Sequence, residues 1–235
     1  MQALILKGNP TVSSSIRCNG FDRLKDLMIL ILSDSESFGR LQNLYVVHLD
    51  KNHLNGSIPP NFEVLNNLSE MRLNDSQLTS LISFGSSNSM QALILKGNPT
   101  VSSSIRCNGF DRLKDLMILI LSKMGFQGPI SESFGRLQNL YVVHLDKNHL
   151  NGSIPSNFEV LNNLSEMRLN DSQLTGSLPF KRETIWRMGR KLRLCNKLDL
   201  CYDAYTGLQD GSASSFLSGI SPCKKSKSTS PRARH

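Results

Sequence analysis

A leucine pattern that recurs every 24 residues limits this chain to a stack of similar turns. Residues 140–148 read L-x-x-V-x-L-x-x-N, and the same spacing appears at 116–124 and 164–172. The L-x-L alternation favours a short strand with apolar side chains on one face. One such turn cannot bury its apolar face alone, so neighbouring turns must stack and their strands must pair in parallel. We therefore expect a solenoid with a parallel β-sheet along one side.

A second, larger period is a duplication. Residues 1–33 and 90–122 are identical, and residues 35–79 match 131–175 with a single difference. Between the matching blocks the second copy carries 123–130, where the first copy has one residue. Over both copies the leucine pattern gives eight candidate turns, and because of the duplication these provide only about four turns of independent evidence for the fold.

We divide the chain into four segments on this basis. They are a truncated duplicate of the repeat block at 1–89, a regular repeat block at 90–180, a capping segment at 181–203 and a disordered basic tail at 204–235.

Two spacings between turns are shorter than the rest. Only 17 residues separate Leu30 from Val47, and a leucine-rich turn needs at least about 20. We expect strain, a lost strand or a jog in the solenoid at this point. The 22 residues between Met71 and Leu93 mark the junction of the two copies, which we expect to be loose.

The second half of each turn carries its own signature. Residues 148–155 read N-x-L-x-G-x-I-P, and 52–59 repeat them. Asn148 is expected to point inward and satisfy backbone groups at the bend, while Met124 and Ser172 interrupt this series. Glycine provides the bend, and proline prevents regular pairing from continuing.

These motifs resemble the plant-specific class of leucine-rich repeats, whose consensus is L-x-x-L-x-L-x-x-N-x-L-x-G-x-I-P. That class includes receptor-like kinases, receptor-like proteins and polygalacturonase-inhibiting proteins. The resemblance implies a leucine-rich-repeat solenoid with a parallel sheet on the concave face and an irregular or 3-10 convex side. It also implies an extracellular or plasma-membrane protein that senses a protein or peptide ligand, a receptor kinase being one candidate partner, with roles in growth or response to microbes.

In this fold a ligand usually binds the outward residues of the concave strands. The alternation also places Lys96, Ser122 and Lys123 on that face, and it gives an apolar patch with charge increasing toward the C-terminal end. The expected ligand-binding residues are Ile94, Ile118, Ile120, Tyr141, Val142, His144, Asp146, Lys147, Glu166, Arg168 and Asn170.

Nothing in the residue pattern favours an enzyme. His144 and Asp146 share one strand face about 7 Å apart, and His149 lies beyond the bend. Neither a positioned nucleophile nor a third metal ligand follows from the spacing. We therefore expect no catalytic residue, no metal and no cofactor.

The net charge of +8 lies entirely in residues 181–235, where 12 Lys and Arg face four acidic residues. A basic end of this kind is usually a solvated surface, and we expect no nucleic-acid partner. If the chain is secreted, Cys195 and Cys201 are candidates to pair and staple the cap. The chain shows no signal peptide and no apolar run long enough to span a membrane.

Six Asn-x-Ser sequences are candidate glycosylation sites. Their density fits secretion, although the repeat consensus itself generates Asn-Gly-Ser and Asn-Leu-Ser. The sites are Asn55, Asn67, Asn74, Asn151, Asn163 and Asn170.

Three functions remain open at this point. The first is a non-catalytic protein that binds a ligand or co-receptor in plant signalling or defence. The second is a secreted inhibitor of a cell-wall-degrading enzyme that uses the same concave face. The third is a degenerate or wrongly assembled gene product without a function of its own.

Overall fold

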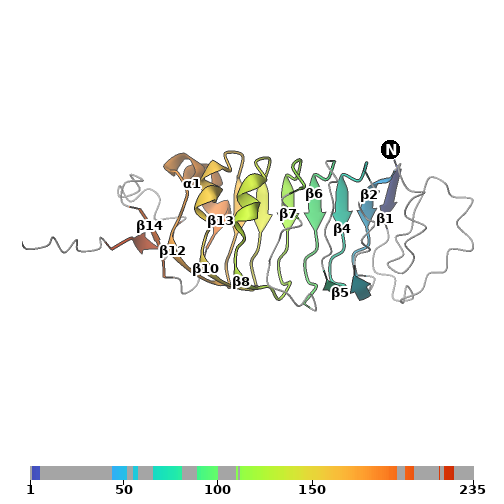
Figure 1. Ribbon diagram of the computed structural model, residues 1–235, viewed down its shortest axis with the longest axis horizontal. Coiled ribbons are helices and arrows are strands. Elements are labelled where there is room, and N and C mark those ends of the chain that lie inside the picture. Colours follow the sequence, from blue (N-terminus) through green and yellow to red (C-terminus); the bar gives the residue numbers. More distant parts are fainter. Residues whose placement is uncertain are drawn as a thin grey trace, which may run out of the picture.

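The computed structural model is an elongated solenoid in which short strands lie side by side along the long axis (Figure 1). It describes residues 2–5, 44–51, 55–57, 66–80, 89–99, 110, 112–194, 199–203, 217 and 220–224.

The described residues form an eight-stranded parallel sheet in the order β1-β2-β4-β6-β7-β9-β11-β13. These strands are β1 (Gln2–Ile5), β2 (Leu44–His48), β4 (Glu70–Arg72), β6 (Ala92–Ile94), β7 (Ile118–Ile120), β9 (Val142–His144), β11 (Glu166–Arg168) and β13 (Leu192–Arg193). The predicted concave sheet is therefore confirmed, and the cap adds its last strand.

The apolar core follows directly from the L-x-L alternation. The inward residue of each strand pairs in register with that of its neighbour, as Leu119 does with Leu93 and Val143. This inward series is buried and consists of Val47, Met71, Leu93, Leu119, Val143, Met167 and Leu192. Burying one such side chain contributes roughly 1.5–3 kcal/mol, so each turn is stabilised by its contact with the next.

The convex side is more regular than expected, because it carries further parallel pairing. Described residues of the second halves form a five-stranded sheet, ordered β15-β14-β12-β10-β8, and a pair, β3-β5. The strands are β3 (Asn55–Ser57), β5 (Gln77–Ser80), β8 (Gln127–Pro129), β10 (His149–Ser153), β12 (Gln173–Ser177), β14 (Leu200–Tyr202) and β15 (Ser221–Pro222). The 3-10 helices η3 (Glu132–Arg136) and η4 (Ser156–Val160) agree with the expected fold, and the second sheet adds to it.

Glycine and proline act in this second sheet as their backbone chemistry dictates. Gly152 and Gly176 lie within β10 and β12 at φ 75° and 88°, which places them in the left-handed region that favours glycine. Strand β10 ends at Ser153, two residues before Pro155. Pro129 lies in β8, the outer strand of its sheet, where the missing N–H leaves no partner unsatisfied.

The two short spacings have different outcomes. Strand β1 pairs directly with β2, with a register shift between Gln2 and Ala3, so no strand from the expected turn at 30–32 lies between them. Those residues lie outside the described part of the chain, so the expected strain, lost strand or jog at this point stays a prediction. At the junction of the copies, Met71 pairs with Leu93 in register, so the sheet continues across it. Residues 81–88, where a loose connection was expected, lie outside the described part of the chain.

The C-terminal segment closes the apolar stack. Helix α1 (Arg182–Met188) and the 3-10 turn η5 (Gly189–Lys191) lead into β13. Ile185 and Met188 are buried, and Arg187 Nε donates a hydrogen bond of 2.9 Å to the Leu164 carbonyl of the last regular turn. Trp186 stays 41% exposed, with the Arg182 guanidinium 5.9 Å from its ring centroid, so the aliphatic residues do the covering.

The disulfide differs from the expected one. Cys201 pairs with Cys223 and not with Cys195, which lies outside the described residues. Strands β14 and β15 are parallel neighbours, and they bring the two Cα atoms to 4.8 Å. Leu217 is also buried, and the structure describes residues 217 and 220–224 of the segment that was expected to be a disordered tail.

Candidate ligand-binding face

The outward side chains of the concave sheet lie in rows across the strands. Ile94, Ile120, His144 and Arg168 occupy one row, because their strands pair in register from β6 to β11. Three of the apolar side chains on the face, Ile94, Ile118 and Ile120, are half-buried. The face therefore changes from apolar to ionic within four neighbouring strands.

An ionic cluster of three side chains occupies β9 and β11. Glu166 Oε1 accepts from His144 Nε2 at 2.8 Å and from the Arg168 guanidinium at 2.6 Å. The duplication repeats this cluster in β2 and β4, where Glu70 contacts His48 at 3.0 Å and Arg72 at 2.5 Å. The two clusters lie four strand spacings apart, or about 19 Å.

Burial and hydrogen bonding shift the pKa values of this cluster. Burial lowers the pKa of His144 below its usual 6.5, since the imidazolium ion loses solvation, although the hydrogen bond with Glu166 opposes this. Burial alone would raise the pKa of Glu166, but the hydrogen bonds from His144 and Arg168 outweigh it and lower that pKa below 4.5. The carboxylate of Glu70 has a lowered pKa for the same balance of reasons.

These shifts predict that acid destabilises the protein. The unfolded chain binds protons at a higher pH than the folded chain at both His144 and Glu166. The free energy of unfolding should therefore fall as the pH decreases through 6.5 and then through 4.5 toward the folded-state values. Urea unfolding at several pH values measures this dependence.

The variant Glu166→Gln should lose less stability on acidification below pH 4.5 than the parent protein, because its unfolded state no longer takes up that proton. Glu70→Gln should behave in the same direction, because the same contacts are present in the first copy. An unchanged pH dependence in both variants would contradict the assignment.

Each turn bends just after its strand at a residue with positive φ. The N–H of this residue donates to the next turn, as Lys123 does to the Asp146 carbonyl at 3.1 Å and Lys147 to the Asn170 carbonyl at 2.9 Å. We call these residues the bend row, and they are Lys51, Asp75, Gly97, Lys123, Lys147 and Asp171. A left-handed conformation costs a residue other than glycine about 1–2 kcal/mol, which the surrounding hydrogen bonds offset.

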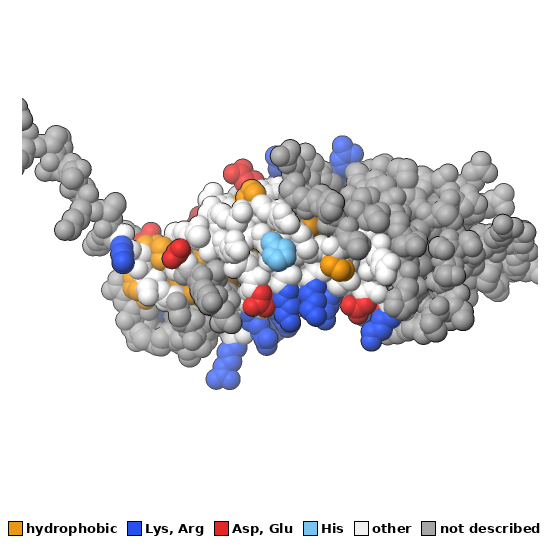
Figure 2. Space-filling view, turned by 90° about the horizontal axis from the view of Figure 1, so that it is seen from below, with side chains coloured by type: hydrophobic (Ala, Val, Ile, Leu, Met, Phe, Trp, Pro, Cys, Tyr) orange, Lys and Arg blue, Asp and Glu red, His pale blue; other side chains and the backbone are white. Residues whose placement is uncertain are grey.

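Basic side chains gather on this edge of the solenoid. Figure 2 shows Lys and Arg side chains clustered near the middle of the edge, with acidic side chains nearby. Lys96, Lys123 and Lys147 are all exposed there. The Asp146 carboxylate beneath them is 9% exposed and accepts a hydrogen bond of 2.6 Å from Ser122 Oγ.

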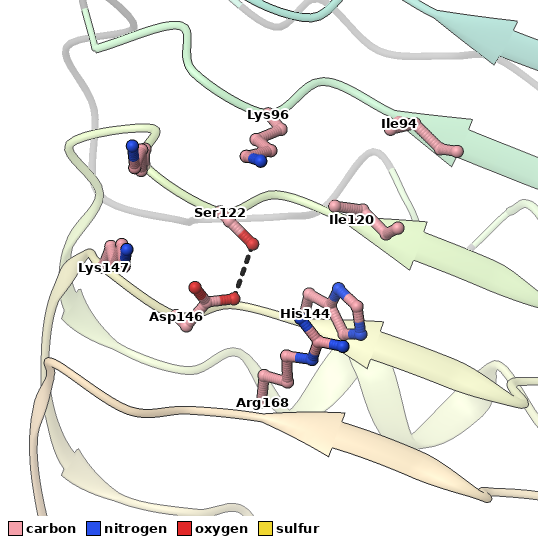
Figure 3. A pocket seen from close by; sticks show the side chains of 9 residues that line it. Ile94, Lys96, Ile120, Ser122, His144, Asp146, Lys147 and Arg168 are labelled. Carbon is pink, nitrogen blue, oxygen red and sulfur yellow. Dashed lines mark hydrogen bonds between the residues drawn. The ribbon is translucent and has the colours of Figure 1, made fainter. Parts of the chain in front are cut away.

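The basic edge and the apolar patch meet in one pocket. It has a volume of about 290 Å³, and successive strands present its side chains toward the same opening (Figure 3). The lining residues are Ile94, Lys96, Ile120, Ser122, Lys123, His144, Asp146, Lys147 and Arg168.

The pocket brings together only part of the expected site. Six expected residues line it, and they are Ile94, Ile120, His144, Asp146, Lys147 and Arg168. Ile118, Val142 and Glu166 lie on the sheet beside it, and Tyr141, just before β9, is 45% exposed. Asn170 follows β11 and bonds to Asp171. The sequence placed Lys96, Ser122 and Lys123 on the face without including them in the site.

The His/Asp group considered for metal binding is divided between the two sheets. His144 belongs to β9, whereas His149 begins β10 and is exposed. The described residues hold no group of three or more His, Cys, Asp or Glu side chains arranged to bind a metal ion.

The candidate glycosylation sites differ in accessibility. Asn67, Asn151 and Asn163 are exposed, while Asn74 and Asn170 are half-buried. The side chain of Asn55, in β3, lies outside the described residues. Because Asn170 is also an expected ligand-binding residue, a glycan there would cover one end of the face. Among the described helices, none has the length and apolar character needed to cross a membrane.

Comparison with known proteins supports the repeat assignment. The Leucine Rich Repeat family model matches residues 43–65, whose counterpart in the second copy is 139–161. Comparison with curated proteins gives no match.

Several solved structures are similar to this chain. A leucine-rich-repeat protein of Leptospira interrogans is 28% identical at a TM-score of 0.63, covering 86% of this chain and 50% of that one. The Arabidopsis receptor kinase HAESA ectodomain, solved with an extended IDA peptide hormone, is 27% identical at 0.60, covering 85% and 32%. The plant peptide hormone receptor RGFR1, solved with RGF2, is 25% identical at 0.59, covering 71% and 26%.

This chain thus spans about a quarter to a half of the length of these structures. The stacked parallel strands, the matched repeat and these similarities together show that the chain has the leucine-rich-repeat fold.

Proposed function

We propose that this chain is a non-catalytic ligand-binding protein of plant signalling or defence, which binds a protein or peptide through its concave face. The observation that carries the proposal is the pocket where half-buried isoleucines meet exposed lysines. Concave surfaces that combine apolar walls with a few converging polar groups are typical binding sites. The similarity to receptors solved with the peptide hormones IDA and RGF2 supports a peptide as the ligand.

A narrower resemblance supports the receptor-like branch of the class. The stretch 93–203 looks most like the receptor-like proteins called Piriformospora indica-insensitive protein 2, chiefly through residues 181–203. By this resemblance we place the protein outside the cell or at the plasma membrane, as a glycoprotein, with a receptor kinase as a candidate partner. The disulfide between Cys201 and Cys223 supports that placement, because such bonds persist mainly in oxidising compartments.

The function is tested by capturing a partner and then weakening its site. The immobilised chain is exposed to a panel of secreted plant peptides and, separately, to secreted microbial polygalacturonases. Ile120→Asp and Arg168→Glu should each raise the dissociation constant of the captured partner at least tenfold, which is equivalent to about 1.4 kcal/mol of binding free energy. Surface plasmon resonance measures the dissociation constants. Selective capture of a polygalacturonase would instead favour an enzyme inhibitor that uses the same face.

The duplication provides a matched control for this experiment. His48→Glu changes the same ionic cluster in the first copy, on β2, which β4 separates from the nearest pocket strand β6, and it should leave binding within about twofold. Thr175→Asp places a charge on the exposed second sheet and should also have little effect. The concave site is wrong if both controls weaken the partner as much as Ile120→Asp does.

A further inference from the structure

The basic pocket is suited to hold an anion. Lys96, Lys123 and Lys147 reach its rim from three successive turns, and none of them forms an ion pair within the described part of the chain. Neighbouring parallel strands are about 4.8 Å apart, so these ammonium groups repel one another across the opening. An anion bound between them removes this repulsion and gains charge-assisted hydrogen bonds.

The charge balance of the pocket favours an anion with one or two charges, such as a carboxylate. Four cationic side chains line the pocket, but Arg168 is already paired with Glu166, which lies beside it. Asp146 contributes a negative charge at the floor, and Ser122 is committed to it. The remaining excess is therefore about two positive charges.

The apolar side of the pocket indicates which chemical group the ligand carries next to its anion. Ile94 and Ile120 lie side by side on β6 and β7 in the lining (Figure 3). Ile94 lies two residues from Lys96 and Ile120 lies three residues from Lys123, or about 7 and 10 Å along the chain. A ligand that fills both halves must carry an apolar group a few carbon atoms away from its anion.

We propose that this pocket binds a carboxylate with an adjoining aliphatic group, and that the chain has one such site despite its duplication. The proposal rests on the proposed function and gives the ligand of that face a chemical class. A peptide provides this combination through an acidic side chain or a chain terminus next to an aliphatic residue.

We expect one site and not two because the duplicated block is incomplete in the first copy. Lys51 and Lys147 have the same neighbours in sequence and nearly the same φ, 59° and 58°. Lys147 and Lys123 line the pocket from adjacent turns, but Lys123 belongs to the segment 123–130, which the first copy lacks. Strand β2 instead follows β1 directly in the sheet. The first copy therefore lacks the second lysine of the rim.

Hexanoate is a suitable probe, because it combines one carboxylate with an alkyl chain. Titration monitored by Ile methyl resonances and by calorimetry should show one saturable site in the millimolar range, as expected for so small a ligand. Hexanol and hexylammonium should bind at least tenfold more weakly, since neither offers a negative charge. Binding of hexanoate should also weaken as the salt concentration rises.

The matched variants are Lys147→Asp and Lys51→Asp. Aspartate occupies the bend row at Asp75 and Asp171, so both substitutions fit the backbone. Lys147→Asp should lower the affinity for hexanoate at least tenfold, whereas Lys51→Asp should lower it less than twofold. Circular dichroism and thermal unfolding establish that both variants fold, and Lys123→Gln provides a milder second test of the same rim.

Three results would overturn the proposal: two equivalent hexanoate sites, equal affinity for hexanol, or equal losses in the two lysine variants. Two further ligands identify the source of the carboxylate in a peptide. Tighter binding of N-acetyl-leucine supports a chain terminus, and tighter binding of the blocked dipeptide acetyl-Leu-Asp-amide supports an acidic side chain. If hexanoate binds as expected but no captured partner responds to Ile120→Asp, the proposed function fails while the carboxylate site stands.

Discussion

Replacing Asn148 by Ala should lower the free energy of unfolding by about 3–5 kcal/mol, a large effect for one side chain. Asn148 is buried, and its amide nitrogen donates to the carbonyls of Leu121 at 2.9 Å and Leu145 at 2.8 Å. Its oxygen accepts from the N–H groups of Met124 at 2.9 Å and Phe126 at 3.2 Å. The substitution leaves several buried backbone groups without a partner, each costing about 1–3 kcal/mol before any relaxation.

The next turn provides the control for this substitution. Ser172 holds the position equivalent to Asn148, but its buried hydroxyl has no hydrogen-bond partner. Ser172→Ala should therefore change the free energy of unfolding by less than about 1 kcal/mol, or increase it slightly. Chemical denaturation of both variants measures the difference. A cost at Asn148 no larger than that at Ser172 would show that the side-chain bonds do not stabilise the turns.

Replacing Cys223 by Ser should lower the free energy of unfolding by about 3 kcal/mol, because the disulfide to Cys201 closes a loop whose ends are 22 residues apart. The loss of the bond also frees β15 from β14, so amide protons of the terminal strands should exchange faster. Thermal unfolding with and without reductant measures the effect, and reductant should destabilise the parent protein but not the variant.

Cys195→Ser distinguishes this bond from the pairing that the sequence suggested. If the disulfide joins Cys201 to Cys223, the Cys195 variant should keep its sensitivity to reductant. Loss of that sensitivity in Cys195→Ser, together with its persistence in Cys223→Ser, would show that the shorter pairing forms instead.

The concave sheet was predictable because short sequence patterns within each turn determine its strands. The alternation Leu119-x-Leu121 fixes which side chains point inward, and the 24-residue repeat places the next strand beside it. The sequence also predicted that Asn148 points inward, because the backbone groups of a buried bend need hydrogen-bond partners.

The second sheet was harder to predict because its strands carry weak local signals. Strands β8 and β10 hold Gly128 and Gly152 at positive φ, and they read as turns when each is considered alone. Their pairing arises only because the first sheet has already fixed the stacking. The disulfide was missed for a related reason, since Cys223 reaches Cys201 through strand pairing and not through closeness in sequence.

The pocket was only partly predictable, because its lysines occupy different positions in their turns. Lys123 and Lys147 lie in the bend row, whereas Lys96 aligns with Ser122 one residue earlier. A search for lysines at one repeated position of the turn therefore finds only two of the three lysines of the pocket. Their convergence depends on how adjacent bends present their side chains to a common opening.

The bend row separates the architecture of this solenoid from its surface chemistry. Gly97, Asp75 and Lys123 share one left-handed backbone conformation although their side chains differ in size and charge. Backbone N–H groups make the contact with the next turn at Gly97 and at Lys123 alike, so the side chain there is not needed for stacking. The charge along this edge can therefore diverge one turn at a time during evolution, and a duplicated array can acquire a new specificity while keeping its inherited scaffold.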